Sequence, residues 1–311
     1  MFPADFAYVR AESLEDALTL LAAGGADGEG ETPADIKILA GGQSLLPMMK
    51  LRLAVPDLLV DIGGLAELAY AAADGALTRI GALTTYRQLQ RDPLIARRFP
   101  AFGDALAVLA DPQVRARGTI GGSVAHGDPA ADMLAVLLAV DAQVTVAGRG
   151  GLRAVPLDDF LLGVFTTQLG ADEIVTEIVI PHAAAIQAYE KFEQPASHLP
   201  LAGVCVAADV VGGVINEPRI AVTGVAGRAF RARAAEEILR GTVLRGTVLR
   251  GGAAGPAAAD VVRAAAARVA DGVEPLADQH ASGPFRLHLA EVLTRRALAR
   301  ALTRAGTPQF P

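Results

Sequence analysis

The strongest limit on the architecture of this chain comes from a short apolar run that ends in paired glycines. Residues 36–46 read IKILAGGQSLL, and the first four residues have the character of a short buried strand that leads towards Gly41 and Gly42. Glycine tolerates positive φ and lets the backbone approach a ligand closely, and successive N–H groups in such a turn form an anion-binding concavity. The segment therefore predicts a strand followed by a turn that can hold phosphate.

A second turn of the same kind follows at residues 119–123, which read TIGGS. A single Gly-Gly pair is weak evidence, because such a pair more often marks a plain loop. Two such turns, each beside an apolar run, can hold the two ends of one diphosphate. We therefore interpret them together as candidate diphosphate-binding turns.

Composition excludes several classes of partner. The 311 residues, 52% of them hydrophobic, suffice for two ordinary domains. The net charge is −6 and the pI is about 5.4, so the chain has no basic field to collect nucleic acid or anionic lipid. No apolar run reaches the roughly 20 residues of a spanning helix, and the N-terminal residues carry no apolar signal region. We expect a cytoplasmic protein that meets the inner face of a membrane only through a complex.

Two reactive side chains have structural explanations. Cys205, the only cysteine, lies in the alternating apolar segment LAGVCVAADV, which favours a small buried hydrophobe over a nucleophile. A lone cysteine cannot build a disulfide, a zinc site or an iron–sulfur site. His126 has no second histidine or carboxylate at metal spacing nearby, so we expect a loop or core position for it.

The first part of the chain predicts closely alternating strands and short helices. After the second glycine turn, Asp128 is expected to cap a helix that begins at Pro129, with Asp132 in its first turn. The residues alone favour a carboxylate that suits the helix dipole over a ligand contact for Asp132. The other elements predicted here are a helix over 14–22, a strand over 77–83, a short helix capped by Thr84, a helix over 101–110, and strands over 143–147 and 173–180.

The composition changes after Pro181. Three further strands are predicted over 186–192, 201–210 and 219–225, with turn signals at Pro195, Gly212-Gly213 and Glu217-Pro218. The short connections favour antiparallel pairing, and helices are predicted over 232–240, 256–270 and 285–304. The direct repeat LRGTVLRGTVLRG, which starts at Leu239, is interpreted as a small duplication in a loop or helix end.

Two long segments resemble a known family. AGGQSLLPMMKLRLAVPDLLVDI and DPQVRARGTIGGSVAHGDPAAD resemble the FAD-binding medium subunit of the molybdenum hydroxylases, of the carbon monoxide dehydrogenase and xanthine dehydrogenase type. The segments PADFAYVRAESLEDALTLL, EIVTEIVIP, YEKFEQPASH and PFRLHLAEVLTRRAL extend the resemblance over nearly the whole chain.

The resemblance implies an α+β fold with two parts. Residues 1–182 would form an FAD-binding domain of the PCMH (vanillyl-alcohol oxidase-like) type, divided into subdomains 1–62 and 63–182. Residues 183–311 would form a smaller C-terminal domain of the CO dehydrogenase flavoprotein type. Its antiparallel sheet of three or four strands would pack against helices.

The resemblance also implies which residues bind FAD. The first glycine segment would wrap the diphosphate and the second would grip it from the other side. Leu109 and Ala110 would pack near the flavin or its tail, Asp132 would lie near the nucleotide, and Val175 would lie close to the ring system. The whole set comprises Ile38, Leu39, Ala40, Gly41, Gly42, Gln43, Ser44, Leu45, Leu109, Ala110, Thr119, Ile120, Gly121, Gly122, Ser123, Asp132, Val175 and Lys191.

This chain departs from the family pattern at two positions. Ser123 stands where xanthine dehydrogenases commonly have asparagine, a short polar exchange that still donates and accepts hydrogen bonds. Glu193 aligns with a basic residue that lies near the flavin in many relatives, and a negative charge there would disfavour the anionic reduced flavin. Lys191 is the alternative cation for this role.

The function implied is electron transfer inside a larger enzyme. Electrons from a molybdopterin cofactor in a large subunit would pass through 2Fe-2S clusters in a small subunit to FAD in this chain, and then to an external acceptor. A dimer of heterotrimers is expected, with no catalytic residue and no metal in this chain. The substrate and the acceptor stay open.

Two alternatives remain. A self-sufficient FAD-dependent oxidase or dehydrogenase of the same superfamily would need convergent polar side chains in its second domain. Only three histidines, His198, His280 and His288, follow residue 183, which disfavours this alternative. A flavin-free scaffold is disfavoured because both glycine turns are intact.

Overall fold

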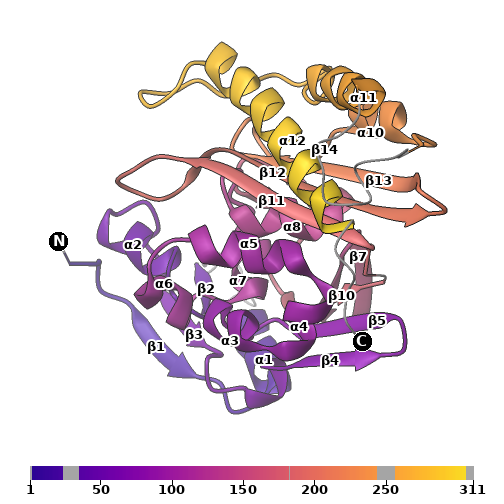
Figure 1. Ribbon diagram of the computed structural model, residues 1–311. Coiled ribbons are helices and arrows are strands. Elements are labelled where there is room, and N and C mark those ends of the chain that lie inside the picture. Colours follow the sequence, from indigo (N-terminus) through magenta and orange to yellow (C-terminus); the bar gives the residue numbers. More distant parts are fainter. Residues whose placement is uncertain (1, 24–34, 182, 244–255, 306–311) are drawn as a thin grey trace.

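The computed structural model describes residues 2–23, 35–181, 183–243 and 256–305 (Figure 1). Helices and strands are mixed, and sheets of different kinds organise successive parts of the chain. A three-stranded parallel sheet comes first, followed by a five-stranded antiparallel sheet and a four-stranded antiparallel sheet. This is the α+β arrangement expected from the sequence.

The first sheet contains the strand that precedes the first glycine segment. Its order is β1-β3-β2, formed by β1 (Ala7–Arg10), β3 (Leu58–Asp61) and β2 (Ile36–Leu39). Parallel strands need long crossovers, and the helices α1 (Leu14–Ala23) and α2 (Leu45–Lys50) lie within these connections. Apolar residues of α1 and β3 form a small core under this sheet.

The second sheet is antiparallel and supports a group of short helices. Its order is β4-β5-β10-β6-β7, with β4 (Ala71–Asp74), β5 (Leu77–Gly81), β10 (Ile174–Ile180), β6 (Gln143–Gly148) and β7 (Gly151–Pro156). The helices between β5 and β6 are α3 (Tyr86–Arg91), α4 (Pro93–Arg98), α5 (Pro100–Val108), α6 (Pro112–Arg117), α7 (Ile120–His126) and α8 (Asp132–Ala139). Smaller elements are η1 (Ala66–Leu68), α9 (Leu157–Phe160), β8 (Leu161–Gly163) and β9 (Thr166–Thr167).

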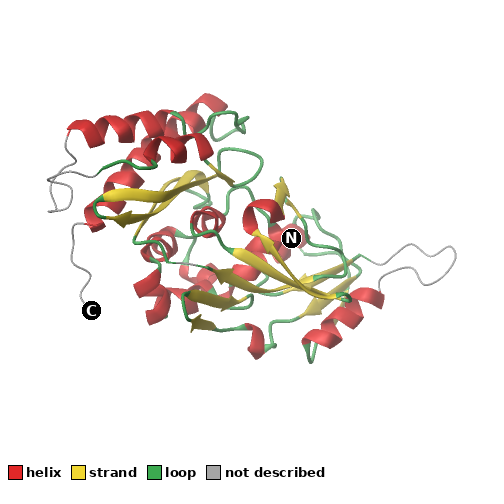
Figure 2. Cartoon of the chain, turned by 90° about the vertical axis from the view of Figure 1, so that its right-hand side faces the viewer, coloured by secondary structure: helices red, strands yellow, loops and turns green. Residues whose placement is uncertain are grey.

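The third sheet lies between two layers of helices. Its order is β11-β12-β13-β14, with β11 (Ile186–Glu193), β12 (Pro200–Val211), β13 (Val214–Thr223) and β14 (Phe230–Arg231). The helices α10 (Arg233–Leu239), α11 (Pro256–Ala267) and α12 (Gly283–Ala305) cover one face, and α5 and α8 pack against the other (Figure 1). Figure 2 shows the same layers after a quarter turn.

The alternation of side chains along β12 explains why the third sheet can lie between two layers of helices. Cys205 and Ala207 belong to the core shared with α8, whereas Val204 and Val206 belong to the core shared with α12. Successive side chains of a strand point to opposite faces, so a strand buried on both faces reads as a continuous apolar run. Every residue of α8 is buried, which explains why its sequence is apolar all round after Asp132.

Two predicted helix starts are wrong. The helix expected from Pro129 begins at Asp132, because the side chain of Asp128 accepts from the backbone N–H of Ala130 and closes a local turn instead. The cap of α3 is Thr85 and not Thr84. Thr84 is buried and its hydroxyl donates to a backbone carbonyl, whereas Thr85 forms a reciprocal capping box with Gln88.

Two turn expectations also differ from the structure. Glu217-Pro218 lies inside β13, in a bulge opposite Ala208 where proline is tolerated because the ladder is interrupted. The TIGGS segment is the capped first turn of α7 and not an open loop, since Thr119 Oγ1 accepts from Gly122 N–H. The repeat that starts at Leu239 falls mostly on residues 244–255, outside the described residues.

Among the residues that the structure describes, no helix combines the length and the apolar character needed to cross a bilayer.

Candidate functional site

The second glycine segment is held by the chain that leads into α3. The backbone N–H of Gly121 donates to Ala82 O at 2.9 Å, and the N–H of Tyr86 donates to Gly118 O at 3.0 Å. A Cβ on Gly121 would overlap Ala82, and a Cβ on Gly122 would lie 2.7 Å from the capping oxygen of Thr119. Both glycines are therefore required by the close approach of their neighbours.

The first glycine segment forms a tight turn between β2 and α2. Gly42 has φ of +73°, which favours glycine, and the side-chain amide of Gln43 donates to Gly41 O at 3.3 Å. Gln43 and Ser44 are exposed, and the Ser44 side chain makes no capping hydrogen bond with α2. This turn consequently presents free polar groups to a ligand.

The two glycine segments lie side by side. A Cβ on Gly41 would overlap the carbonyl group of Arg117 and would come within 3.0 Å of Gly118 Cα, directly before Thr119. The backbones can meet only because Gly41 lacks a side chain. The arrangement fits a diphosphate held between two backbone turns.

The predicted residues do not all face this junction. Ile38 and Ala40 pack against the small apolar core under the first sheet, and Ile120 is fully buried. Leu39 and Leu45 are half-buried at the two ends of the turn.

Asp132 forms the centre of a buried polar group. Its side chain is 5% exposed, and it accepts a hydrogen bond of 2.7 Å from the Tyr189 hydroxyl. Lys191 Nζ lies 3.0 Å from Asp132 Oδ1 and donates to Val108 O at 3.0 Å. Burial raises the pKa of the Asp132 carboxyl, and the charge of Lys191 and the Tyr189 hydrogen bond oppose this shift. Asp132 is therefore more than a helix-terminal carboxylate, since it pairs with a buried cation from β11 of the third sheet.

Lys191 and Glu193 occupy different environments. The side chain of Lys191 is 3% exposed, whereas that of Glu193 is 40% exposed. Glu193 lies 3.8 Å from Lys191 Nζ and 3.3 Å from His198 Nδ1. Lys191 is thus the inner charge beside Asp132, and Glu193 is the outer charge, partly balanced by its neighbours.

The remaining predicted residues flank this group. Leu109 and Ala110 follow Val108 directly, and their carbonyls accept from Arg115 Nη1 at 2.7 and 2.8 Å. Val175 is buried on β10, where pairing with β6 is irregular. The carbonyl of the next residue, Thr176, accepts from Ala82 N–H, which connects β10 to the support of Gly121.

Sequence reasoning missed two tyrosines. Tyr86 contacts Ser123 through its hydroxyl, and Tyr189 donates to Asp132. No motif marks Tyr86. Tyr189 opens the segment YEKFEQPASH, which by itself gives it no role, and it meets Asp132 only through the fold. The alternation of β11, which turns Tyr189 and Lys191 to one face, is the one signal that associates Tyr189 with the predicted site.

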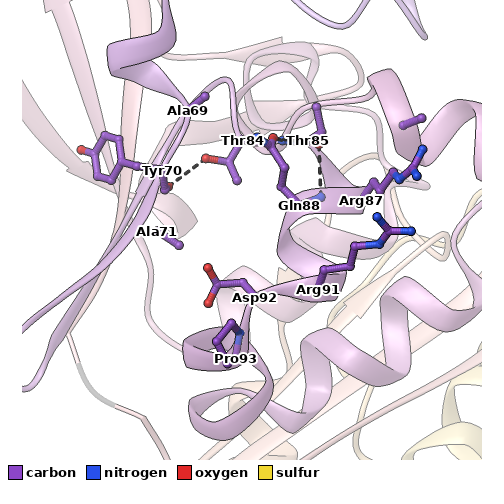
Figure 3. Close-up of a pocket in the computed structure, with 11 residues that line it drawn as sticks. Ala69, Tyr70, Ala71, Thr84, Thr85, Arg87, Gln88, Arg91, Asp92 and Pro93 are labelled. Atoms are coloured by element: carbon purple, nitrogen blue, oxygen red, sulfur yellow. Dashed lines mark hydrogen bonds between the residues drawn. The ribbon is translucent and has the colours of Figure 1, made fainter.

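A separate hollow lies beside α3 (Figure 3). Its volume is about 660 Å³, and Arg87 and Arg91 extend from α3 at its rim. Within the part of the chain that the structure describes, neither guanidinium has an ionic or hydrogen-bonding partner. None of the predicted FAD residues lines this hollow, which is formed by Ala69, Tyr70, Ala71, Thr84, Thr85, Arg87, Gln88, Arg91, Asp92, Pro93 and Ala116.

Comparison with known proteins identifies the family. Residues 4–183 match the FAD binding domain in molybdopterin dehydrogenase, and residues 187–301 match the CO dehydrogenase flavoprotein C-terminal domain. The chain is 36% identical over 308 residues to the carbon monoxide dehydrogenase medium chain of Hydrogenophaga pseudoflava, covering 98% of this chain and 100% of that protein. It is 35% identical over 294 residues to the nicotine 6-hydroxylase medium subunit of Paenarthrobacter nicotinovorans, covering 94% of this chain and 96% of that protein.

The structural comparison agrees. Carbon monoxide dehydrogenase from Hydrogenophaga pseudoflava matches with a TM-score of 0.87 and 38% sequence identity, over 98% of this chain and 99% of that chain. The predicted fold class and the predicted cofactor are thereby confirmed. This chain belongs to the FAD-binding medium subunits of the molybdenum hydroxylases, and it is an oxidoreductase subunit whose cofactor is FAD.

Proposed function

We propose that this chain relays electrons from iron–sulfur clusters of a small partner subunit, through FAD, to an external acceptor. The electrons would originate at a molybdopterin cofactor in a large partner subunit, and the assembly would be a dimer of heterotrimers in the cytoplasm. The observation that carries the proposal is the contact between the two glycine segments, because it forms one cradle from residues distant in sequence.

The proposed residues have distinct tasks. FAD supplies the redox chemistry when bound, and the protein supplies its position and electrostatic surroundings. Gly41, Gly42 and Ser44 would hold the diphosphate from one side, and residues 119–123 from the other. Leu109 and Val175 would limit the space for the ring system.

The buried pair of Asp132 and Lys191 would place one negative and one positive group near the nucleotide. Tyr189 holds Asp132 in position through a hydrogen bond of 2.7 Å. Since Lys191 is the inner charge and Glu193 the outer one, we propose that Lys191 is the cation that acts on the flavin. A fixed positive charge favours an anionic reduced flavin.

The proposed domain boundary stays at residues 182/183, with a subdivision at 62/63. The two family matches, which end at 183 and begin at 187, support this boundary. The change from the parallel first sheet to the antiparallel second sheet supports the subdivision.

The test is purification of the natively expressed chain with its natural partners. A complex of three different subunits that contains FAD, molybdenum and iron supports the proposal. Reduction of the flavin by the complex after substrate is added at the molybdenum subunit would support the relay itself. A lone chain that binds FAD and turns over a substrate by itself would show instead a self-sufficient flavoenzyme.

A further inference from the structure

Tyr86 connects the start of α3 to both ends of the second glycine segment. Its ring is buried, and an ideal Cβ on Gly118 would lie only 3.2 Å from the ring carbon Cδ2. Its backbone N–H donates to Gly118 O, and its hydroxyl is hydrogen-bonded to Ser123 Oγ. A single residue thus bonds to the residue before Thr119 through its backbone and to the last residue of the segment through its side chain.

The direction of the Tyr86–Ser123 hydrogen bond follows from the surroundings. Burial raises the pKa of the Tyr86 phenol well above its usual range, so the phenol keeps its hydrogen. Among the described residues, Ser123 Oγ is its only hydrogen-bond acceptor. A buried hydroxyl hydrogen without an acceptor is costly, and therefore Tyr86 donates and Ser123 accepts.

This direction leaves the hydrogen of the Ser123 hydroxyl free to bond elsewhere. The described part of the chain offers no acceptor for it, and Ser123 is only half-buried. Serine hydroxyls rotate freely, and a donor on one side restricts the rotation and polarises the O–H bond. The Ser123 hydroxyl is consequently prepared to donate to an external anion.

We propose that Tyr86 is a positioning residue for the FAD diphosphate: it donates to Ser123 Oγ and thereby commits the Ser123 hydroxyl to donate to a diphosphate oxygen. The inference rests on the proposed diphosphate-binding role of residues 119–123. It adds a residue from α3, outside both glycine segments, and it assigns a direction to each hydrogen bond. Tyr86 is buried and would act on the cofactor only through Ser123.

The test is a double-mutant cycle read as FAD affinity. FAD is removed from the complete chain, and the dissociation constant is measured by flavin fluorescence for the wild type, Tyr86→Phe, Ser123→Ala and the double variant. We expect Ser123→Ala to weaken binding about tenfold or more, because it removes a donor to a charged oxygen, and Tyr86→Phe to weaken it about threefold to tenfold. The double variant should bind FAD no more weakly than Ser123→Ala.

Several outcomes would overturn the inference. Wild-type affinity in Tyr86→Phe would show that the phenol does not act, and losses that multiply in the double variant would show that it does not act through Ser123. Wild-type affinity in Ser123→Ala refutes the inference even if Tyr86→Phe does not fold. Failure of the wild type itself to bind FAD would instead contradict the family's cofactor in this chain, so the two failures are distinguishable.

Tyr70→Phe provides the matched control. It removes a phenolic hydroxyl of the same kind, one that donates to Glu177 and not to a glycine segment. Its FAD affinity should equal that of the wild type. The thermal midpoint of each FAD-free variant serves as a second readout. If the role of Tyr86 were purely structural, Tyr86→Phe would lower this midpoint, and the loss of FAD affinity in the double variant would equal the product of the losses in the two single variants.

Discussion

Gly41 shows how a single missing side chain determines the site. Its neighbour is a backbone carbonyl, that of Arg117, and a backbone group cannot rotate away as the end of a flexible side chain can. A Cβ on Gly121 would likewise overlap Cβ, Cα and O of Ala82, none of which can rotate away. These glycines are required by the approach of two backbones, in addition to any ligand.

Gly41→Ala should therefore destabilise the protein and weaken FAD binding together. We expect a loss of about 1–3 kcal/mol in the free energy of unfolding, typical of overpacking. Urea denaturation of the FAD-free protein and FAD titration measure the two effects. Gly103→Ala is the matched control: it lies in α5 with no atom near its Cβ position, so it should be neutral or slightly stabilising. Equal changes in the free energy of unfolding and in FAD affinity for Gly41→Ala and Gly103→Ala would contradict the prediction.

His126, at the end of α7, should make stability depend on pH. Its ring lies 4.9 Å from that of Phe165, and burial lowers the pKa of His126, although Asp128 opposes the shift. The unfolded state then binds more protons between the two pKa values, so stability present above the usual histidine pKa is lost as pH falls through the folded value. His126→Gln should reduce the loss of unfolding free energy between about pH 7.5 and 5.5. If chemical denaturation shows the same loss of unfolding free energy over this pH range in His126→Gln as in the wild type, the prediction is wrong.

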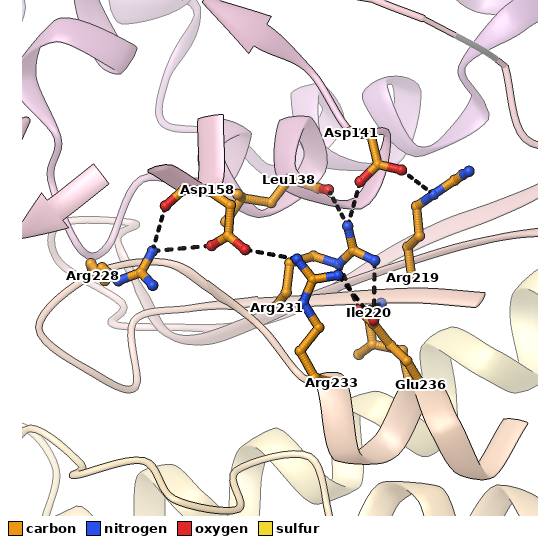
Figure 4. Close-up of polar contacts among 9 residues, drawn as sticks. All are labelled: Leu138, Asp141, Asp158, Arg219, Ile220, Arg228, Arg231, Arg233 and Glu236. Carbon is orange, nitrogen blue, oxygen red and sulfur yellow. Dashed lines mark hydrogen bonds and ion pairs between the residues drawn. The ribbon is translucent and has the colours of Figure 1, made fainter. Parts of the chain in front are cut away.

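At the scale of elements, a network of charges joins β14 and α10 to the end of α8 (Figure 4). The side chain of Arg231 is 6% exposed, and its Nε lies 2.6 Å from Glu236 Oε1, on a side chain that is 4% exposed. Asp141 pairs with Arg231 and Arg219 from the other side. Glu236 also accepts from the backbone N–H of Ile220, so the pair fixes α10 against β13.

Arg231→Leu should destabilise the protein by about 3–5 kcal/mol, because it leaves the buried charge of Glu236 with only the exposed Arg233, 3.7 Å away, as a cationic partner. Adding Glu236→Gln should recover part of the loss, since the amide oxygen still accepts from Ile220. Arg233→Ala is the control: this arginine is 64% exposed on α10, and its removal should cost less than about 1 kcal/mol. Denaturant midpoints measure all three. If Arg231→Leu and Arg233→Ala lowered the free energy of unfolding by similar amounts, the buried pair would contribute no more to stability than an exposed one.

The sequence predicted elements where periodicity was strong and missed details that depend on distant neighbours. The strands β11 and β12, the second half of β13 and the last three helices follow from alternation and helical spacing, whereas the two-residue strand β14 was not predicted. The shift of a cap from Thr84 to Thr85 could not be predicted, because it depends on Thr84 meeting a carbonyl of Tyr70. In the site, motifs indicated the glycine segments, whereas the contacts of Tyr86 with Ser123 and of Tyr189 with Asp132 join different elements and leave no local pattern.

At the scale of the whole molecule, the main core crosses the proposed boundary at 182/183. It contains residues of β5, α5 and α8 together with Tyr189, Cys205 and Ala221 of the third sheet. Asp104 of α5 is 6% exposed and binds Arg304 of α12 through bonds of 2.7 and 2.8 Å. The two sequence domains thus share both an apolar interior and a charged contact.

This sharing predicts that the complete chain unfolds in one cooperative transition. A fragment of residues 183–311 would expose the face of the third sheet that α5 and α8 cover, and so it should not fold alone. Coincident transitions of far-UV and near-UV circular dichroism in urea test the first statement, and the spectrum of the fragment tests the second. FAD should raise the single midpoint of the complete chain, because ligand binds only the native state. Two separate transitions, only one of them raised by FAD, would show that the proposed domains are thermodynamically independent despite their common core.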